Sequence, residues 1–452
     1  MKIYLTRFST STAYENATLE LPNVSLIEDD MEVRYTPLDY SKEYFTFECL
    51  SAGTITITAN IASVSKTISY SIDNGSTWTD LTTSITEQSL GTFAIGDKVL
   101  IKGNNNFYGS AYYNYFGGTA QTKVYGNIMS LIYGDNFIDQ ISFPSGSDSN
   151  FYNLFYRYNN LIDASNLILP ATTLTNNCYY GMFNSCESLI IPPELPATTL
   201  ANYCYTYMFR GCTSLTTVPE LPATTLASYC YNYMFYGTSL ATAPELPATT
   251  LTNCCYNAMF SGCTNLTTAP ELPATTLASY CYYSMFNGCT SLATAPALPA
   301  TTLADYCYSY MFYGCTSLTT TPELPATTLA SYCYYSMFYG CTRLTTAPAL
   351  PATTLADYCY SYMFRNCTSL TIAPALPATT LASYCYYYMF YGCTSLNYIK
   401  AMFTTTPSTS YTDNWVSGVA STGTFVKNSA ATWTTTGVNG IPTGWTVETA
   451  SA

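Results

Sequence analysis

The stretch LPATTLASYCYYSMFNGCTSLATAPA, residues 272–297, decides the fold because it returns along the chain at a constant interval. Its first leucine recurs every 26 residues, except for one interval of 25. In the short copy, YGTSL at 236–240 replaces YGCTSL, which suggests that one cysteine was lost. A period of about 20–50 residues indicates stacked structural repeats. The aligned leucines are Leu169, Leu195, Leu221, Leu246, Leu272, Leu298, Leu324, Leu350 and Leu376.

Comparison of the copies separates invariant positions from variable ones. Leu277, Cys281 and Met285 are spaced i, i+4, i+8, which predicts one face of a short helix or 3-10 turn. The segment between Leu292 and Leu298 predicts an extended piece, and Asn287-Gly288 a connecting turn. The positions that barely vary are, in this copy, Leu272, Leu277, Cys281, Tyr282, Met285, Phe286, Cys289, Leu292 and Pro296.

No single copy can bury its apolar face alone, so the copies are expected to stack into a solenoid with a continuous core. The proline before each Leu-Pro has no N–H to donate, so we expect brief β-bridges between copies instead of a wide sheet. The predicted fold class is therefore a repeat solenoid of 26-residue units over residues 169–401, each unit a short helix or 3-10 turn plus an extended segment.

The pattern Met-Phe-x-x-Cys-x-x-Leu-x-x-x-Pro-x-Leu-Pro, followed by Cys-Tyr-x-x-Met-Phe, resembles the BspA-like, Treponema-type leucine-rich repeats. In that family Ala-Phe-x-x-Cys stands in the place of Met285-Phe286 to Cys289, and isoleucine or a similar residue in the place of Cys281. The resemblance covers about residues 150–400, and both departures keep an apolar stack. It implies a curved solenoid used for adhesion and for protein or glycan binding, with no catalysis.

Residues 44–118 have a different pattern. Segments such as YFTFECL and GTITITA alternate like half-buried strands, and Asp73-Asn74-Gly75 is a strong hairpin signal. We therefore predict a small antiparallel β-sandwich-like domain at 44–118. Residues 1–43 show no clear period and are interpreted as a docking segment; their cluster Glu28, Asp29, Asp30 and Glu32 is interpreted as a solvated loop, with calcium binding as a weaker alternative.

The ends of a repeat array expose its core and need caps. Residues 119–168 are interpreted as an N-terminal cap and degenerate repeat, in which Leu154-Phe155 replaces Met-Phe and Tyr158 replaces the second cysteine. Residues 402–452 are interpreted as a C-terminal cap module. Its strands are expected at GTFVKN and GWTVET, and its packing anchors are expected at Trp415, Trp433 and Trp445.

Composition argues against several classes of function. Charged residues make up 9% of the chain, the net charge is −13, and histidine is absent. Nucleic-acid binding needs a basic stripe and general acid–base chemistry is most often done by histidine, so we expect neither nucleic-acid binding nor catalysis. No four-ligand metal pattern, phosphate-binding loop or nucleophile motif occurs, so no metal or other cofactor is expected. The 19 cysteines are expected to be reduced and buried.

The candidate binding surface is made of the tyrosines that vary around each Met-Phe. Variable residues at fixed places beside an invariant core indicate surface, and tyrosine supplies contact area at low entropic cost. Exposed aromatic rings also stack on sugars. The alternative is that these tyrosines only cover the repeats or pack against a sister chain. The candidates are Tyr207, Tyr233, Tyr236, Tyr283, Tyr310, Tyr313, Tyr335, Tyr339, Tyr362, Tyr387, Tyr388 and Tyr391.

Two functional hypotheses follow. The first is a virion protein of a Bacteroidales phage, a fibre or a capsid or tail decoration. It would join other virion proteins through its N-terminal region and bind a host-surface protein, a glycan or mucin. The second is a bacterial cell-surface adhesin with the same repeats. The N-terminus has no apolar run of signal-peptide type, which we interpret in favour of the virion, and no membrane span is expected. A homo-oligomer is left open.

Overall fold

The chain forms two compact units in a computed structural model. Strands β1 (Ile3–Tyr4) and β2 (Thr18–Leu19) pair antiparallel in the unit Met1–Asp39. Tyr40–Ala452 is the other unit. The structure describes residues 3–4, 18–19, 39–59, 67–81, 84–104 and 114–450. Most of the proposed docking segment, including its whole acidic cluster, therefore lies outside the described residues.

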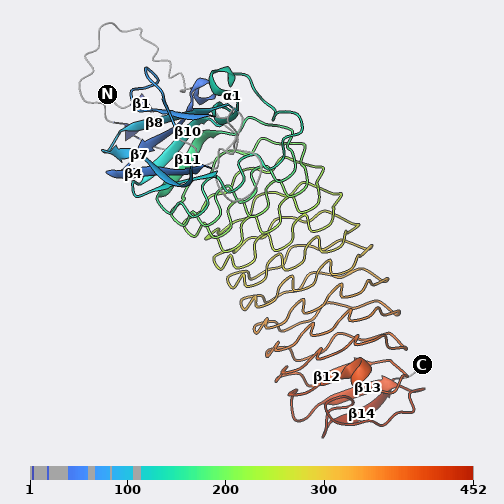
Figure 1. The fold of residues 1–452 in the computed structure, drawn as a ribbon. Coiled ribbons are helices and arrows are strands. Elements are labelled where there is room, and N and C mark those ends of the chain that lie inside the picture. Colours follow the sequence, from blue (N-terminus) through green and yellow to red (C-terminus); the bar gives the residue numbers. More distant parts are fainter. Residues whose placement is uncertain are drawn as a thin grey trace. The chain divides into compact units, whose positions relative to one another are not determined.

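Two β-sheets open the second unit (Figure 1). One has the order β11-β10-β3-β8-β5-β6, and the other has the order β7-β4-β9. Phe47 of β3 and Phe116 of β9 meet with ring centroids 5.0 Å apart, so the sheets share a core, as predicted for a sandwich-like domain. The strands are β3 (Phe45–Cys49), β4 (Gly53–Ala59), β5 (Ile68–Ser71), β6 (Thr79–Asp80), β7 (Ser84–Phe93), β8 (Lys98–Gly103), β9 (Asn114–Gly118), β10 (Thr122–Asn127) and β11 (Leu161–Ile168).

The six-stranded sheet continues past residue 118, where the sequence placed a domain boundary. β10 pairs antiparallel with β3 and parallel with β11. On its other side β11 meets the first repeat through a parallel bridge between Asp163 and Ile191. β11 thus belongs to both the sheet and the repeats, because its two edges pair with different parts of the chain.

Short helical pieces connect these strands. They are η1 (Tyr40–Lys42), α1 (Ser130–Tyr133) and η2 (Gly134–Asn136) near the sheets, and α2 (Thr409–Thr412) near the C-terminus. Over the ranges that the structure describes, no helix combines the length and the apolar character required to cross a membrane.

Between β11 and β12 (Tyr398–Ala401) the repeats contain neither an α-helix nor a 3-10 helix, so the predicted helical turn is wrong. Each copy has a run of turns in which every fourth residue is left-handed, as at Tyr280 (φ 57°), Ser284 (φ 53°) and Gly288 (φ 73°). A helix needs right-handed residues throughout, so these reversals prevent it. The spacing i, i+4, i+8 misled the prediction because a four-residue turn period places the same residues on one side.

Backbone hydrogen bonds in the turn run alternate between two directions. The amide N–H of Tyr282 donates to the carbonyl of Cys307 in the following copy (3.1 Å), and that of Phe286 donates to Met311 (2.9 Å). The amide of Tyr283, between them, donates back to Tyr280 within its own turn (3.3 Å). Each copy is therefore one coil bonded to the next, as the stacked turns in Figure 1 show.

The extended parts of neighbouring coils meet only at isolated parallel bridges, such as Thr276 with Thr302 and Thr294 with Thr320. This confirms the expectation of brief bridges. The ladder is short because the prolines that flank these threonines cannot donate a hydrogen bond.

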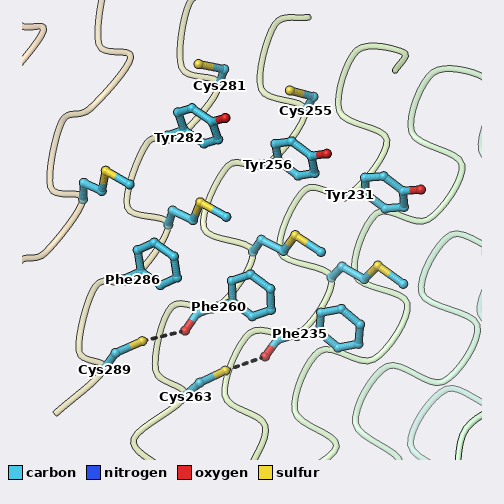
Figure 2. Close-up of a cluster of buried hydrophobic side chains, with 14 of the residues drawn as sticks. Tyr231, Phe235, Cys255, Tyr256, Phe260, Cys263, Cys281, Tyr282, Phe286 and Cys289 are labelled. Atoms are coloured by element: carbon cyan, nitrogen blue, oxygen red, sulfur yellow. Dashed lines mark hydrogen bonds between the residues drawn. The ribbon is translucent and has the colours of Figure 1, made fainter. Parts of the chain in front are cut away.

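The invariant side chains form columns inside the coils (Figure 2). Phe260 and Phe286 stack at 5.9 Å between ring centroids, as do Tyr256 and Tyr282. In the copy at 272–297, every predicted inner residue is buried except the half-buried Pro296; in four other copies the leucine that closes ATTL is also half-buried. Identical rings that repeat from coil to coil thus give the core its regularity, with each aromatic pair contributing about 0.5–1.5 kcal/mol beyond its buried area.

The short copy keeps this interior because a threonine takes the place of the second cysteine. Thr238 Oγ1 donates to the carbonyl of Phe235 (2.9 Å) and lies 3.2 Å from Cys263 Sγ. Thr238 stands 26 residues after Cys212 and so occupies the position of the second cysteine. The residue that this copy lacks is therefore absent from the turn that follows Thr238. The interpretation that the cysteine itself was deleted is therefore wrong.

Both ends continue the coil pattern. Leu154, Phe155 and Tyr158 are buried, as predicted for a degenerate first repeat. At the C-terminus, β12, β13 (Thr424–Asn428) and β14 (Thr446–Ala450) form a parallel sheet, near the two predicted strands. The three indoles are buried, and the Trp415 N–H donates to Gly440 (3.0 Å).

Candidate functional site: the tyrosine face

The twelve candidate tyrosines lie outside the core columns, and all are half-buried. We call them the tyrosine face. Tyr334 and Tyr335 show the division in one coil, since the first is 1% exposed in the inner column and the second belongs to the face. The structure therefore places the variable tyrosines at the surface of the coils.

The rings of the tyrosine face contact one another from coil to coil. Tyr310 and Tyr335 lie 5.3 Å apart between centroids with planes at 62°, and Tyr335 and Tyr362 repeat this arrangement at 5.4 Å. Tyr313 and Tyr339, after the Met-Phe pairs, stack at 4.5 Å. The candidates are thus brought together in two groups of contacting rings, Tyr207 to Tyr236 and Tyr283 to Tyr391, separated by the copy at 246–271, which has no tyrosine at these positions.

A second tyrosine row lies beside this face and was not among the candidates. We call it the outer ladder; its tyrosines stand just before the first cysteine of a copy and stack at 4.4–4.8 Å. Tyr280 touches Tyr283 of the face at 5.7 Å. Recurrence of tyrosine before Cys-Tyr could have identified the row. Its members are Tyr203, Tyr229, Tyr280, Tyr306, Tyr332, Tyr358 and Tyr384.

Within the outer ladder, Tyr306, Tyr332 and Tyr358 have both ring faces covered. Tyr332 stacks on Tyr306 on one side and on Tyr358 on the other, in each case at 4.4 Å. A sugar that stacks on an aromatic ring needs a free ring face. Inside this ladder, ring edges and hydroxyl groups are what remains for a partner.

The hydroxyls of Tyr283 and Tyr335, two members of the tyrosine face, stay protonated at neutral pH. Burial raises the pKa of Tyr283 to about 12, with a further contribution from the neighbouring Tyr310. The pKa of Tyr335 is raised further by the same two causes. A neutral phenol both donates and accepts hydrogen bonds, so the surface offers adaptable polar contacts on a rigid aromatic base.

Two arginines are set into the tyrosine face, at the position after Met-Phe. The guanidinium of Arg210 lies 5.5 Å from the ring centre of Tyr207 and 5.4 Å from that of Tyr236. That of Arg365 lies over four tyrosine rings at 4.6–5.4 Å. Rings hold such cations through their quadrupole, so both positive charges are fixed in place by the surrounding tyrosines.

The repeat cysteines, all except Cys49 and Cys254, form two buried columns. All 19 are free and buried. The second cysteine of a copy donates its thiol to a phenylalanine carbonyl of the preceding coil, as in Cys289 to Phe260 (3.1 Å) (Figure 2). Burial raises the pKa of Cys281 and Cys289 well above the ordinary value. Among the described residues no cluster of acids or cysteines is arranged to hold a metal ion.

Comparison with known proteins identifies the family of the repeats. A family model for the BspA type leucine rich repeat region, in six copies, matches residues 172–310 and 302–412. Together these matches span more than half of the chain. Comparisons with curated proteins and with solved structures gave no match.

Proposed function

Since the chain belongs to the BspA-type leucine-rich-repeat family, we propose that it is a non-catalytic adhesion protein that binds its partner through the tyrosine face. The observation that carries this proposal is the division of roles among the tyrosines. One column is invariant and buried, whereas the tyrosine face varies from coil to coil and keeps part of each side chain exposed. Tyrosine and arginine are the residues that dominate binding energy at protein interfaces.

The proposed architecture behind this function is a solenoid. Its support is the repetition of the inter-coil hydrogen bonds at the repeat interval, from Tyr203 N–H to Ser228 up to Phe390 N–H to Trp415. A solenoid offers an extended surface on which many equivalent positions can be varied independently, because each coil touches only its neighbours.

The proposed setting is the virion of a Bacteroidales phage, as a fibre or a capsid or tail decoration that attaches to its host, to mucin or to another surface molecule. The free, buried thiols favour folding in a reducing compartment such as the cytosol where virions assemble. The second setting is the surface of a bacterial cell, which the family membership favours.

The direct test is binding to intact Bacteroidales cells and to immobilised mucin. The full chain is labelled with a fluorophore, and bound protein is measured by flow cytometry and on mucin-coated plates. A triple variant, Tyr310→Ser, Tyr335→Ser and Tyr362→Ser, is expected to lose at least about tenfold in affinity, because it removes three adjacent aromatic anchors.

The matched control changes exposed threonines on the same coils but outside the tyrosine face, at Thr301→Ala, Thr327→Ala and Thr353→Ala. It should bind like the unchanged chain. Equal binding by both triple variants would contradict the proposal. If the tyrosine variant instead changes the mass measured by light scattering, the face packs against a sister chain.

A further inference from the structure

Arg365 stands out within the tyrosine face because its charge is surrounded by rings. Its guanidinium carbon lies 4.6 Å from the ring centre of Tyr391, and 5.3–5.4 Å from those of Tyr339, Tyr362 and Tyr388. Tyr362 and Tyr388 are themselves stacked at 5.3 Å. The side chain therefore loses little further freedom when something binds to it, which favours affinity.

No acidic side chain among the described residues pairs with Arg365. Its Nε is buried and has no hydrogen-bond partner in the described part of the chain, although the residue as a whole is half-buried. By contrast, Lys102 pairs with Asp135 at 2.8 Å. The chain has 27 acidic and 14 basic residues, so a carboxylate partner within the chain was not scarce. The terminal Nη donors of this guanidinium, and not the buried Nε, are thus left for a group from outside.

We infer that Arg365 is the centre of an oxyanion-binding site that takes a carboxylate of an acidic peptide on the partner protein. The inference rests on the proposed binding role of the tyrosine face. The planar guanidinium presents its donors in a fixed fork that matches the two oxygens of a carboxylate. The hydroxyls of the surrounding tyrosines are further hydrogen-bond donors.

A peptide fits this site better than a sugar does. Tyr362 stacks on Tyr388 at 5.3 Å, and the guanidinium of Arg365 lies over the Tyr362 ring at 5.4 Å. Tyr335 and Tyr387 add T-shaped contacts at 5.4 and 5.2 Å. Sugar stacking needs free ring faces, whereas a carboxylate needs only the guanidinium fork and nearby hydroxyls. The chain also supplies arginines with different numbers of ring contacts for comparison. Arg365 contacts four rings, Arg210 contacts two, and Arg343 is exposed with no ring contact in the described structure.

The test follows the arginine side chains of the full-length protein by NMR, after labelling with nitrogen-15 arginine. Acetate is titrated first, with sodium chloride at matched ionic strength as the reference. The Nε–H signal of Arg365 is expected to shift and saturate, at a concentration about tenfold or more below any response of Arg343, with Arg210 between them.

The Arg365→Asn variant identifies the Arg365 signal, because that signal disappears, and it removes the proposed site. The variant should fold, because Asn184 and Asn287 stand at the same position in other copies. Arg343→Ser is the matched control, because serine is the usual residue at that position; it should leave the Arg365 response unchanged. No acetate response of Arg365 beyond that to chloride, or an equal response at Arg343, overturns the inference.

A second pair of probes identifies the source of the carboxylate. A blocked tripeptide of glutamate should shift the Arg365 signal more strongly than acetate, and an oligomer of glucuronate should not. A response to the glucuronate oligomer alone overturns the peptide assignment. These titrations need no partner protein. If the tyrosine triple variant loses cell binding as expected, but Arg365 of the unchanged chain does not respond to the anion, this inference is overturned and the proposed function is not.

Discussion

At the scale of single residues, the same amino acid serves two purposes within one coil. Tyr334 lies in the inner column and stacks on Tyr308 at 5.8 Å, whereas Tyr335 lies in the tyrosine face. Comparison of copies within the chain predicted this division, because burial tolerates little variation. The contact of Arg365 with four rings could not be predicted, because it depends on how side chains from three coils converge.

The buried thiols and phenols make stability fall in alkaline solution. Burial raises the pKa of Cys204 to about 12 and that of Tyr282 well above its ordinary value. In the unfolded chain, thiols ionise near pH ~8.5 and phenols near ~10. The folded state is therefore at full stability below about pH 8.5, and its stability falls as pH rises toward 12, because only the unfolded chain releases these protons.

The expected result is a urea midpoint that is constant from about pH 7 to 8 and then decreases steadily above about pH 8.5. Iodoacetamide at pH 8 should label the repeat cysteines slowly in the native protein and rapidly in urea, because the thiolate is the reactive form. A midpoint that stays unchanged up to pH 10, or rapid labelling of the native protein, would contradict the burial of these columns.

At the scale of elements, the repeat interval, the extended piece and the turn at Gly288 were predictable from the sequence. The run of left-handed turns was not. A period of four places Leu277, Cys281 and Met285 on one side whether the backbone is helical or turns at every fourth residue. Tyr280 and Ser284 did not indicate left-handed turns in the sequence, because non-glycine residues rarely adopt positive φ.

Ser284 tests this turn geometry. Its φ of 53° costs a non-glycine residue roughly 1–2 kcal/mol, whereas glycine adopts it freely and loses about 0.5–1 kcal/mol in entropy. Ser284→Gly is therefore expected to raise the free energy of unfolding by roughly 0.5–1 kcal/mol. Ser279→Gly, five residues earlier and without positive φ, should lower it by a similar amount. Urea unfolding measures both, and a loss of stability in Ser284→Gly would speak for a helical segment.

At the scale of the whole molecule, the array of 26-residue units was predictable, but the places where it begins and ends were not. β11 is an edge of the six-stranded sheet and also meets the first coil. The amide of Gly392 still bonds to Ser417 (2.8 Å), so the coil pattern runs past the predicted boundary at 402. The sequence changes at both places, while the hydrogen bonding continues across them.

The claim that each repeat interval is one stacked coil is tested most directly by removing one interval. Deletion of residues 272–297 joins Glu271 to Leu298, which restores the native junction. The deleted protein should unfold in one sigmoidal urea transition, and X-ray scattering should show a longest dimension shorter by about 4.8 Å, one inter-strand spacing. Deletion of residues 272–284 breaks the register and should abolish that transition. If the two deletions are equally damaging, the stacked-coil account is wrong.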